Sequence, residues 1–237
     1  LVFHMRSGGA GHLKHQFIDY GSVSEANSLA LGRDSRYARW GKALFDLGLG
    51  LMLLPVLLPV ILVLCVLVAM DGGLPIFGNK RIGKDGREFR CWKIRTMVVD
   101  AQERLKKHLA DNPEAAAEWQ QNFKLENDPR ITRIGRFLRK SSLDELPQLF
   151  NVFRGEMSFV GPRPVVRDEL LRYGLHQQVY MSMRPGVTGL WQVSGRNDVA
   201  YDQRVSMDVQ YAREVSLTED VRIVAKTVSS VLSLTGK

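Results

Sequence analysis

Residues 47–70 read LGLGLMLLPVLLPVILVLCVLVAM, and this run sets how the whole chain is organised because it contains no charged residue. About 20 consecutive apolar residues are enough for a helix to cross the hydrocarbon core of a bilayer. A single membrane-spanning helix is the ordinary interpretation of such a run. Two prolines within it and the charges beside it favour a different arrangement.

Pro55 and Pro59 lie in the middle of the run. Because proline has no N–H, they leave the carbonyls of Leu51 and Pro55 without helical partners and predict a bend. Lysines and arginines flank both ends, whereas a spanning helix normally has them on one side only. These residues are Arg33, Arg36, Arg39 and Lys42 before the run, and Lys80, Arg81, Lys84, Arg87 and Arg90 after it. We therefore expect a re-entrant helix-break-helix hairpin centred near Pro59, with both ends on the cytoplasmic face; a single span is the alternative.

The composition is that of a basic, folded protein. With 237 residues and 45% hydrophobic content, the chain can form a real core. Its 33 Lys plus Arg exceed 25 Asp plus Glu, which favours an anionic partner: nucleic acid, a phosphorylated metabolite or a lipid surface. Cys65 and Cys91 lie in unlike surroundings, so we expect reduced thiols rather than a disulfide.

Outside the apolar run the sequence predicts an α+β fold that is mostly helical. Residues 75–97 contain the Asp85-Gly86 turn signal between two strand-like pieces, which indicates a small β-hairpin. Residues 99–124 have helical character on both sides of a break at Asn112-Pro113. Residues 128–142 predict an amphipathic basic helix, which we expect to lie at the lipid headgroups.

Three segments follow from this pattern. Residues 1–38 are expected to be an N-terminal segment that is flexible or in part not native, since the opening LVFHM does not resemble native sequence. Residues 39–72 are the expected membrane hairpin. Residues 73–237 are the expected cytoplasmic catalytic domain.

Asp144 and Glu145 are adjacent carboxylates immediately after a basic run, in RKSSLDELPQLFN at residues 139–151. Ser142 and Glu145 fit a capping box, which would give the pair a purely structural role at a helix start. An ionised carboxylate in that position can also attack phosphorus. Its neighbour could then hold Mg²⁺, which bridges to substrate phosphates. The residues alone leave both interpretations open.

Several basic residues could give charge-assisted contacts to a diphosphate. They are Lys93, Arg95, Arg163, Arg184 and Arg196. Such a set is consistent with phosphoryl transfer at a membrane surface. The competing hypothesis is a non-catalytic, membrane-anchored adaptor whose basic face binds anionic lipid. We expect no nucleic-acid partner, because no nucleic-acid-binding motif is present.

A series of motifs carries a family resemblance. They are KRIG (80–83), KIRTM (93–97), DPRITRIGRFLRKSSLDELPQLFNVFRGEMSFVGPRP (128–164), RPGVTGLWQVSGRND (184–198) and DVQYAREVSLTED (208–220). In this order they closely resemble the bacterial sugar transferases known as monotopic phosphoglycosyl transferases, over about residues 40–235. The wording of GEMSFVGPRPVV and WQVSGRNDV is most similar to enzymes that start exopolysaccharide synthesis with galactose or glucose.

The resemblance implies transfer of a hexose 1-phosphate from a UDP-sugar to undecaprenyl phosphate, with release of UMP. It implies that Asp144 attacks the sugar-bearing phosphate to form a phosphosugar-aspartate. Glu145 would be the Mg²⁺ partner beside Asp144 and a proton acceptor. The resemblance also matches further positions to the phosphate and metal site. These are Lys93, Arg163, Arg184 and Asp208, with Arg196 a candidate for nucleotide contact.

The resemblance further implies a place on the cytoplasmic face of the bacterial inner membrane, with the bilayer and downstream glycosyltransferases as partners. A homodimer is left open. The family's membrane segment usually bends at a Ser-Pro pair, whereas this chain has Leu58-Pro59 and an additional Pro55. The serine hydroxyl that could satisfy a freed carbonyl is therefore missing.

Overall fold

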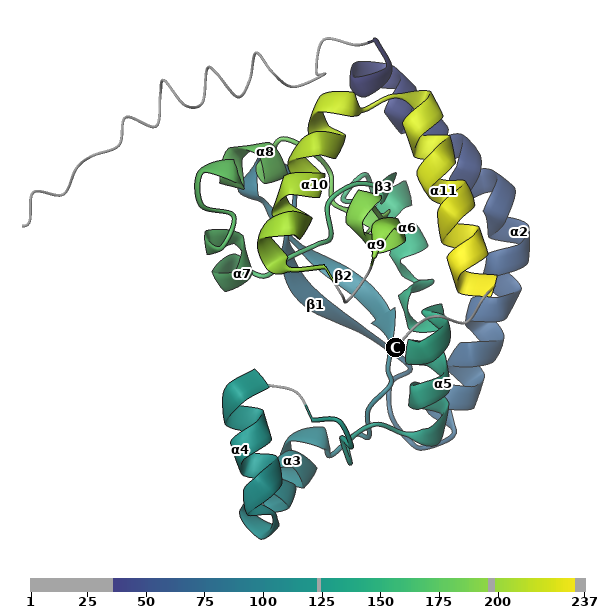
Figure 1. Cartoon of the computed structure of the whole chain (residues 1–237). Helices are drawn as coiled ribbons and strands as arrows, with labels where there is room; N and C mark the ends of the chain where they lie inside the picture. The colour runs from purple at the N-terminus through teal and green to yellow at the C-terminus, as the bar shows by residue number, and fades with distance from the viewer. Residues whose placement is uncertain (1–35, 123–124, 196–198, 233–237) are drawn as a thin grey trace, which may run out of the picture.

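The structure, a computed structural model, describes residues 36–122, 125–195 and 199–232 (Figure 1). It is mostly helical and contains two small sheets, which confirms the expected α+β class. Its elements are η2 (Tyr37–Gly41), α2 (Lys42–Ala69), β1 (Ile76–Ile82), η3 (Lys84–Gly86), β2 (Glu88–Ile94), α3 (Ala101–Asp111), α4 (Pro113–Asn122), α5 (Arg133–Ser141), η4 (Leu143–Glu145), α6 (Gln148–Phe153), β3 (Ser158–Val160), α7 (Arg167–Leu171), η5 (Gly174–His176), α8 (Gln177–Met181), β4 (Gly186–Thr188), α9 (Leu190–Ser194), α10 (Tyr201–Glu214) and α11 (Leu217–Leu232). The expected N-terminal segment lies outside the described residues except for its last three.

The apolar run forms one continuous helix, so the predicted helix-break-helix geometry is wrong. With η2, α2 gives an unbroken helical stretch of 33 residues, Tyr37–Ala69, long and apolar enough to cross a membrane. Pro55 and Pro59 both lie inside α2 and are exposed. Because the two prolines are four residues apart, they lie on the same outward face of the helix. The carbonyls that they leave without a hydrogen bond, those of Leu51 and Pro55, lie on that face too. The helix therefore curves around the body of the molecule instead of breaking (Figure 1).

One face of α2 packs on the rest of the protein along most of its length. Near its start, Asp46 and Gly50 are buried, and a Cβ added to Gly50 would lie 3.0 Å from the Phe153 ring of α6. Near its end, Leu64 and Val68 join a buried cluster with Ile94 of β2 and Leu138 of α5. The opposite face of α2 remains exposed.

The predicted hairpin is confirmed. β1 and β2 pair antiparallel from Ile76↔Ile94 to Ile82↔Glu88. The turn lies in η3, where Asp85 and Gly86 have φ of 58° and 72°. Asn151 of α6 holds the free edge of β2, since its side chain accepts from the Trp92 N–H at 3.1 Å and donates to the Arg90 carbonyl at 2.7 Å. A second sheet pairs β3 with β4 in parallel.

The helical segments beyond the hairpin follow the sequence, except that the basic helix is shorter than the predicted 128–142, because Ile131 pairs with Met97 in a β-bridge and only Arg133–Ser141 are helical. α3 ends at Asp111 and α4 begins at Pro113, as the Asn112-Pro113 break predicts, and the two helices project from the body (Figure 1). The basic helix α5 begins at Arg133, with the Thr132 hydroxyl accepting from the Gly135 N–H at 2.8 Å. Its expected position at lipid headgroups stays a prediction.

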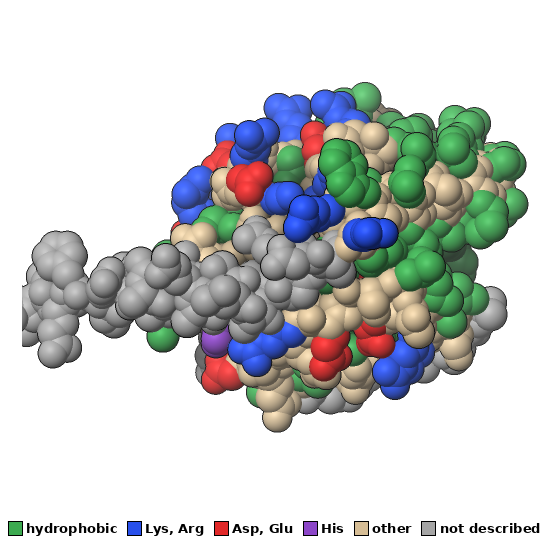
Figure 2. All heavy atoms as spheres, turned by 90° about the horizontal axis from the view of Figure 1, so that it is seen from above, with side chains coloured by type: hydrophobic (Ala, Val, Ile, Leu, Met, Phe, Trp, Pro, Cys, Tyr) green, Lys and Arg blue, Asp and Glu red, His purple; other side chains and the backbone are tan. Residues whose placement is uncertain are grey.

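Apolar side chains gather over one side of the molecule, the side where α2 and α11 lie (Figure 2). The exposed large apolar residues of α2 are Leu44, Leu47, Leu51, Met52, Val56, Val60, Leu62, Val63, Val66 and Leu67. Exposed apolar surface on this scale marks an interaction site rather than ordinary soluble surface.

Candidate active site

Asp144 and Glu145 lie in the one-turn helix η4, between the end of α5 and the start of α6. The chain reverses at Ser142, which adopts the left-handed conformation (φ 58°, ψ 17°) that non-glycine residues rarely use. The Ser142 side chain makes no cap hydrogen bond, so the predicted capping box is wrong. Ser142 ends one helix, and its left-handed backbone directs the chain into the next turn.

Packing of α5 against the end of β2 fixes the position of this turn. A Cβ on Gly135 would lie 2.0 Å from the carbonyl oxygen of Thr96, so only glycine permits so close an approach. The same carbonyl accepts from the Thr132 N–H at 3.1 Å. At the other end of α5, Arg139 Nε donates to Thr96 Oγ1 at 2.9 Å. The carboxylates are thereby held beside β2.

Lys93 of β2 contacts both carboxylates. Its Nζ lies 2.6 Å from Glu145 Oε1 and 3.9 Å from Asp144 Oδ2. The Asp144 side chain is 13% exposed and that of Glu145 33%, so Asp144 is the more enclosed of the two. The structure thus brings together three residues that the sequence predicts as a site.

Burial raises the pKa of Asp144 from its ordinary 3.8 to about 6. The charge of Lys93 opposes this rise, the neighbouring charge of Glu145 adds to it, and Arg139 opposes it. Asp144 is therefore mostly ionised at neutral pH, but less firmly than an exposed aspartate. A nucleophile needs that ionised form.

Arg139 is a site residue that the sequence predictions omit. It lies in the last turn of α5, and its charge acts on Asp144. A basic residue at a helix C-terminus has a structural explanation in the helix dipole, which is why its position in the run gave no distinct signal.

Arg81 lies on the same face of the hairpin as Lys93, because it pairs with Phe89, four residues before Lys93 on β2. The Cys91 thiol is 1% exposed, and its burial raises its pKa to about 11. The charges of Lys93, Glu145, Arg81 and Arg163 all act on the pKa of this thiol. Arg163 is exposed and therefore accessible to a ligand. Arg81 is a second residue absent from the predicted set.

Arg184 lies beside the loops at the two ends of β3. Its guanidinium would be 3.7 Å from a Cβ on Gly155, and its carbonyl oxygen would be 2.5 Å from a Cβ on Gly161. Within the described ranges no hydrogen bond or ion pair joins Arg184 to Asp144 or Glu145. Its predicted phosphate contact stays a prediction.

The Arg95 guanidinium binds backbone carbonyls of the protein, including one at the end of α2. Its Nε donates to the Leu74 carbonyl at 2.9 Å, Nη1 to the Met97 carbonyl at 2.9 Å, and Nη2 to the Val68 carbonyl at 3.0 Å. Asp71 forms an ion pair with the same guanidinium. Phosphate contact by Arg95 would require release of these bonds.

Asp208 lies in α10 and is 2% exposed. The Tyr173 hydroxyl donates to it at 2.8 Å. Burial raises its pKa to about 7, and this hydrogen bond partly opposes the rise. The structure thus places Asp208 in a tyrosine cluster and shows no contact of it with the described carboxylates of η4. Arg196 lies outside the described residues.

The donor set fits magnesium held jointly with substrate. Among the described residues, no group of three or more His, Cys, Asp or Glu side chains is arranged around a common point. Mg²⁺ is usually bound by one or two carboxylates together with substrate phosphates, not by a protein cage. Asp144 and Glu145 offer two such carboxylates next to Lys93.

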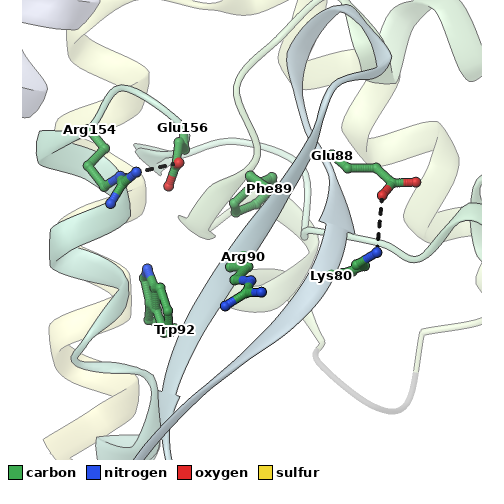
Figure 3. Close-up of a pocket in the computed structure, with 7 residues that line it drawn as sticks. All are labelled: Lys80, Glu88, Phe89, Arg90, Trp92, Arg154 and Glu156. Carbon is green, nitrogen blue, oxygen red and sulfur yellow. Dashed lines mark ion pairs between the residues drawn. The ribbon is translucent and has the colours of Figure 1, made fainter.

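A cavity of about 340 Å³ lies against the hairpin beside the α6–β3 connection (Figure 3). It is lined by Lys80, Glu88, Phe89, Arg90, Trp92, Arg154 and Glu156. Side chains alternate along a strand, so Arg90 and Trp92 point away from the face that carries Lys93. Arg154 and Glu156 form an ion pair at 3.3 Å within it (Figure 3). Lys93, Asp144 and Glu145 do not line this cavity, so it is separate from the carboxylate site.

Comparison with known proteins agrees with the motif pattern. The profile of the family described as bacterial sugar transferase matches residues 37–234. A UDP-galactose-lipid carrier transferase of Erwinia amylovora is 53% identical over 199 residues, 84% of this chain and 42% of that protein. An undecaprenyl-phosphate galactose phosphotransferase of Salmonella typhimurium is 51% identical over 201 residues, 85% of this chain and 42% of that protein.

A shorter relative, the exopolysaccharide production protein ExoY of Rhizobium meliloti, is 52% identical over 174 residues, 73% of this chain and 77% of that protein. The chain spans about two-fifths of the length of the first two relatives. The profile match nevertheless takes in α2, the hairpin and both carboxylates of η4. The chain therefore belongs to the bacterial sugar transferase family.

Proposed function

We propose that this protein transfers a hexose 1-phosphate from a UDP-sugar to undecaprenyl phosphate and releases UMP, as the first membrane step of exopolysaccharide, capsule or O-antigen synthesis. The observation that carries the proposal is the carboxylate pair of η4 beside Lys93, with Lys93 Nζ 2.6 Å from Glu145. The names of the relatives, a UDP-galactose-lipid carrier transferase and an undecaprenyl-phosphate galactose phosphotransferase, support the substrate classes.

The proposed reaction has two displacements at the same phosphorus. In the first, a carboxylate oxygen of Asp144 bonds to the sugar-bearing phosphorus, and the bond from that phosphorus to the bridging oxygen breaks. UMP leaves with the bridging oxygen and its electron pair. In the second, a phosphate oxygen of undecaprenyl phosphate bonds to the same phosphorus and the Asp144 carboxylate leaves. The product is undecaprenyl-diphosphate-hexose.

The surroundings of Asp144 suit this role. A carboxylate that is only 13% exposed is poorly hydrated, which leaves it available to attack. Lys93 and Arg139 favour its ionised form and would counter the negative charge of the incoming diphosphate. Glu145, with Asp144, would hold Mg²⁺. That ion supplies neutralisation of the diphosphate and of the departing UMP.

We also infer that the chain lies on the cytoplasmic face of the inner membrane, with the exposed face of α2 in the lipid. The helix is about 42 Å long by its 28 residues. Both halves of it pack on the same body, which argues against a helix that stands across the bilayer with the body outside. Basic residues flank both of its ends, as expected where both ends stay cytoplasmic.

The adaptor hypothesis required the carboxylate pair to serve only as a helix cap. The Ser142 side chain makes no such cap, and Glu145 turns to Lys93 instead. No observation favours an adaptor over an enzyme, so we propose the enzyme alone.

The decisive experiment measures UMP release by the full chain in lipid nanodiscs with UDP-galactose or UDP-glucose, undecaprenyl phosphate and Mg²⁺. We expect release that depends on all three components, and the preferred UDP-hexose identifies the sugar. Asp144→Asn should lower turnover by a factor on the order of 10³ or more with the fold intact.

Asp168→Asn, which changes an exposed aspartate in α7, is the matched control and should retain wild-type turnover. Near-normal turnover in Asp144→Asn would refute the assignment of the nucleophile. No UMP release from any UDP-hexose by the wild type would refute the function itself.

A further inference from the structure

Tyr180 of α8 inserts its hydroxyl between two chain segments that meet at the turn end of the β1–β2 hairpin. Ile82, the last residue of β1, and Val165 form an isolated antiparallel bridge, in which the Ile82 N–H donates to the Val165 carbonyl at 2.9 Å. The return bond from Val165 goes instead to the Tyr180 oxygen at 3.2 Å. The Tyr180 hydroxyl in turn donates to the Ile82 carbonyl at 2.7 Å. One side chain thus takes the place of a backbone hydrogen bond.

Each of the two bridged segments carries an arginine close to the bridge. Arg81 directly precedes Ile82, and Arg163 precedes Val165 by two residues, between Pro162 and Pro164. Proline fixes its own φ and restricts the residue before it, so the segment from Pro162 to Val165 moves as a stiff unit. The charges of both arginines act on Cys91 together with those of Lys93 and Glu145. The bridge at Val165 therefore fixes where Arg163 lies relative to the hairpin that carries Lys93.

The Tyr180 side chain is buried and packs against Tyr173. It is 1% exposed, and the Tyr173 ring meets it edge-on with centroids 5.1 Å apart. The Tyr173 hydroxyl donates to buried Asp208 at 2.8 Å. Ile82, Val165, Tyr173 and Tyr180 all belong to one buried cluster. Asp208 thus supports the bridge through two tyrosines.

We propose that Tyr180 is a positioning residue, which places Arg163 for the diphosphate of the UDP-sugar by setting the Ile82–Val165 bridge. The proposal rests on the proposed function. Tyr180 does not touch the substrate. Without its hydroxyl, the Val165 N–H and the Ile82 carbonyl must either stay unpaired in a buried place or close on each other. Either change moves Arg163.

The test is Tyr180→Phe, assayed by UMP release in nanodiscs over a range of UDP-sugar concentrations. We expect KM for the UDP-sugar to rise on the order of tenfold with kcat little changed, because a contact made before and during reaction is weakened. Arg163→Ala should raise KM as well. In the Arg163→Ala background, Tyr180→Phe should raise KM no further, because the residue through which it acts is gone.

Tyr211→Phe is the matched control. Tyr211 is also 1% exposed, and its hydroxyl also makes two buried hydrogen bonds, to Asp220 Oδ1 at 2.6 Å and to the Val160 carbonyl at 3.3 Å. It lies in a different buried cluster. We expect Tyr211→Phe to lower the midpoint of thermal unfolding, Tm, without changing KM. If it raised KM as much as Tyr180→Phe does, the effect would be one of general stability and the proposal would fail.

The proposal also fails if Tyr180→Phe has wild-type KM, or if its effect adds in full to that of Arg163→Ala. If Tyr180→Phe does not fold, Tyr173→Phe is measured in its place. It removes the hydrogen bond that holds Tyr173 against Tyr180 and leaves Ile82, Val165 and Tyr180 unchanged. A smaller rise in KM that vanishes in the Arg163→Ala background supports the proposal, and an unchanged KM overturns it. Absence of UMP release by the wild type would instead refute the proposed function.

Discussion

At the scale of single residues, the pKa of Asp144 predicts how the proposed activity depends on pH. Because only the ionised carboxylate attacks phosphorus, kcat/KM should rise with pH through about 6 and level off above it. Lys93 lowers this pKa, so Lys93→Met should move the acidic limb to higher pH as well as reduce the rate. Rates of UMP release from pH 5 to 8 test both effects. If the acidic limb of the pH profile lay at the same pH in the wild type and in Lys93→Met, a group other than Asp144 would govern it.

The same residue predicts a conflict between activity and stability. Its pKa is raised from 3.8 to about 6 in the folded protein, so the native state holds its proton more tightly than the unfolded state. The free energy of unfolding therefore falls as pH rises from about 3.8 to 6, and the loss persists above that. The difference corresponds to at most about 3 kcal/mol. Asp144→Asn should accordingly raise Tm at pH 7.5, with the gain shrinking toward pH 4. An equal Tm gain at both pH values would contradict this cause.

Residue identities at the site were more predictable than residue roles. Asp144, Glu145 and Lys93 stand in motifs with a recognisable pattern, and the structure brings them together. Arg95 has the same charge and neighbourhood in sequence, yet its guanidinium binds the end of α2. The difference lies in contacts between residues about 25 positions apart, and no local pattern encodes these.

At the scale of elements, the sequence predicted local turns well and the course of the long helix poorly. Asp85-Gly86 marks the hairpin because its turn needs left-handed backbone, which few residue types other than Gly, Asn and Asp adopt. Ser142-x-x-Glu145 matches a capping box, but the preceding helix runs up to Ser141 and uses Ser142 as its own end. Pro55 and Pro59 predict lost hydrogen bonds, and whether that gives a break or a curve depends on which face they occupy.

The joint between the start of α2 and α11 predicts a stability effect far from the site. Asp220 is fully buried and accepts from Tyr37 at 2.5 Å, Lys42 at 2.6 Å and Tyr211 at 2.6 Å. Asp220→Ala leaves Lys42 without its partner in a mostly buried place, which should cost about 3–5 kcal/mol. Asp111→Ala, an exposed residue at the end of α3, should change stability by less than about 0.5 kcal/mol. Thermal unfolding of the two variants tests this difference. Equal Tm values for Asp220→Ala and Asp111→Ala would mean that the Asp220 contacts contribute nothing to stability.

At the scale of the whole molecule, the packing of α2 makes a prediction about the membrane that the apolar run alone does not. A spanning helix would place residues before and after it on opposite sides. Here Gly50 near one end and Leu64 near the other both pack on the same body, through α6 and through β2 with α5. If α2 crossed the bilayer, the body of the protein would have to enter the hydrocarbon with it. The surface of the body outside the apolar face carries many charged side chains (Figure 2), which opposes such an arrangement.

Single cysteines at Arg36 and Lys84, two exposed positions on either side of α2, test this arrangement in inside-out membrane vesicles. Cys65→Ala removes the half-buried native thiol, while Cys91 is 1% exposed and should not react. A membrane-impermeant maleimide should label both Arg36→Cys and Lys84→Cys in these vesicles, and neither in right-side-out spheroplasts. The protein without introduced cysteines is the control for background labelling. Labelling of one position in each preparation would establish a true span, because the ends of the helix would then lie on opposite faces and the body could not pack along its whole length.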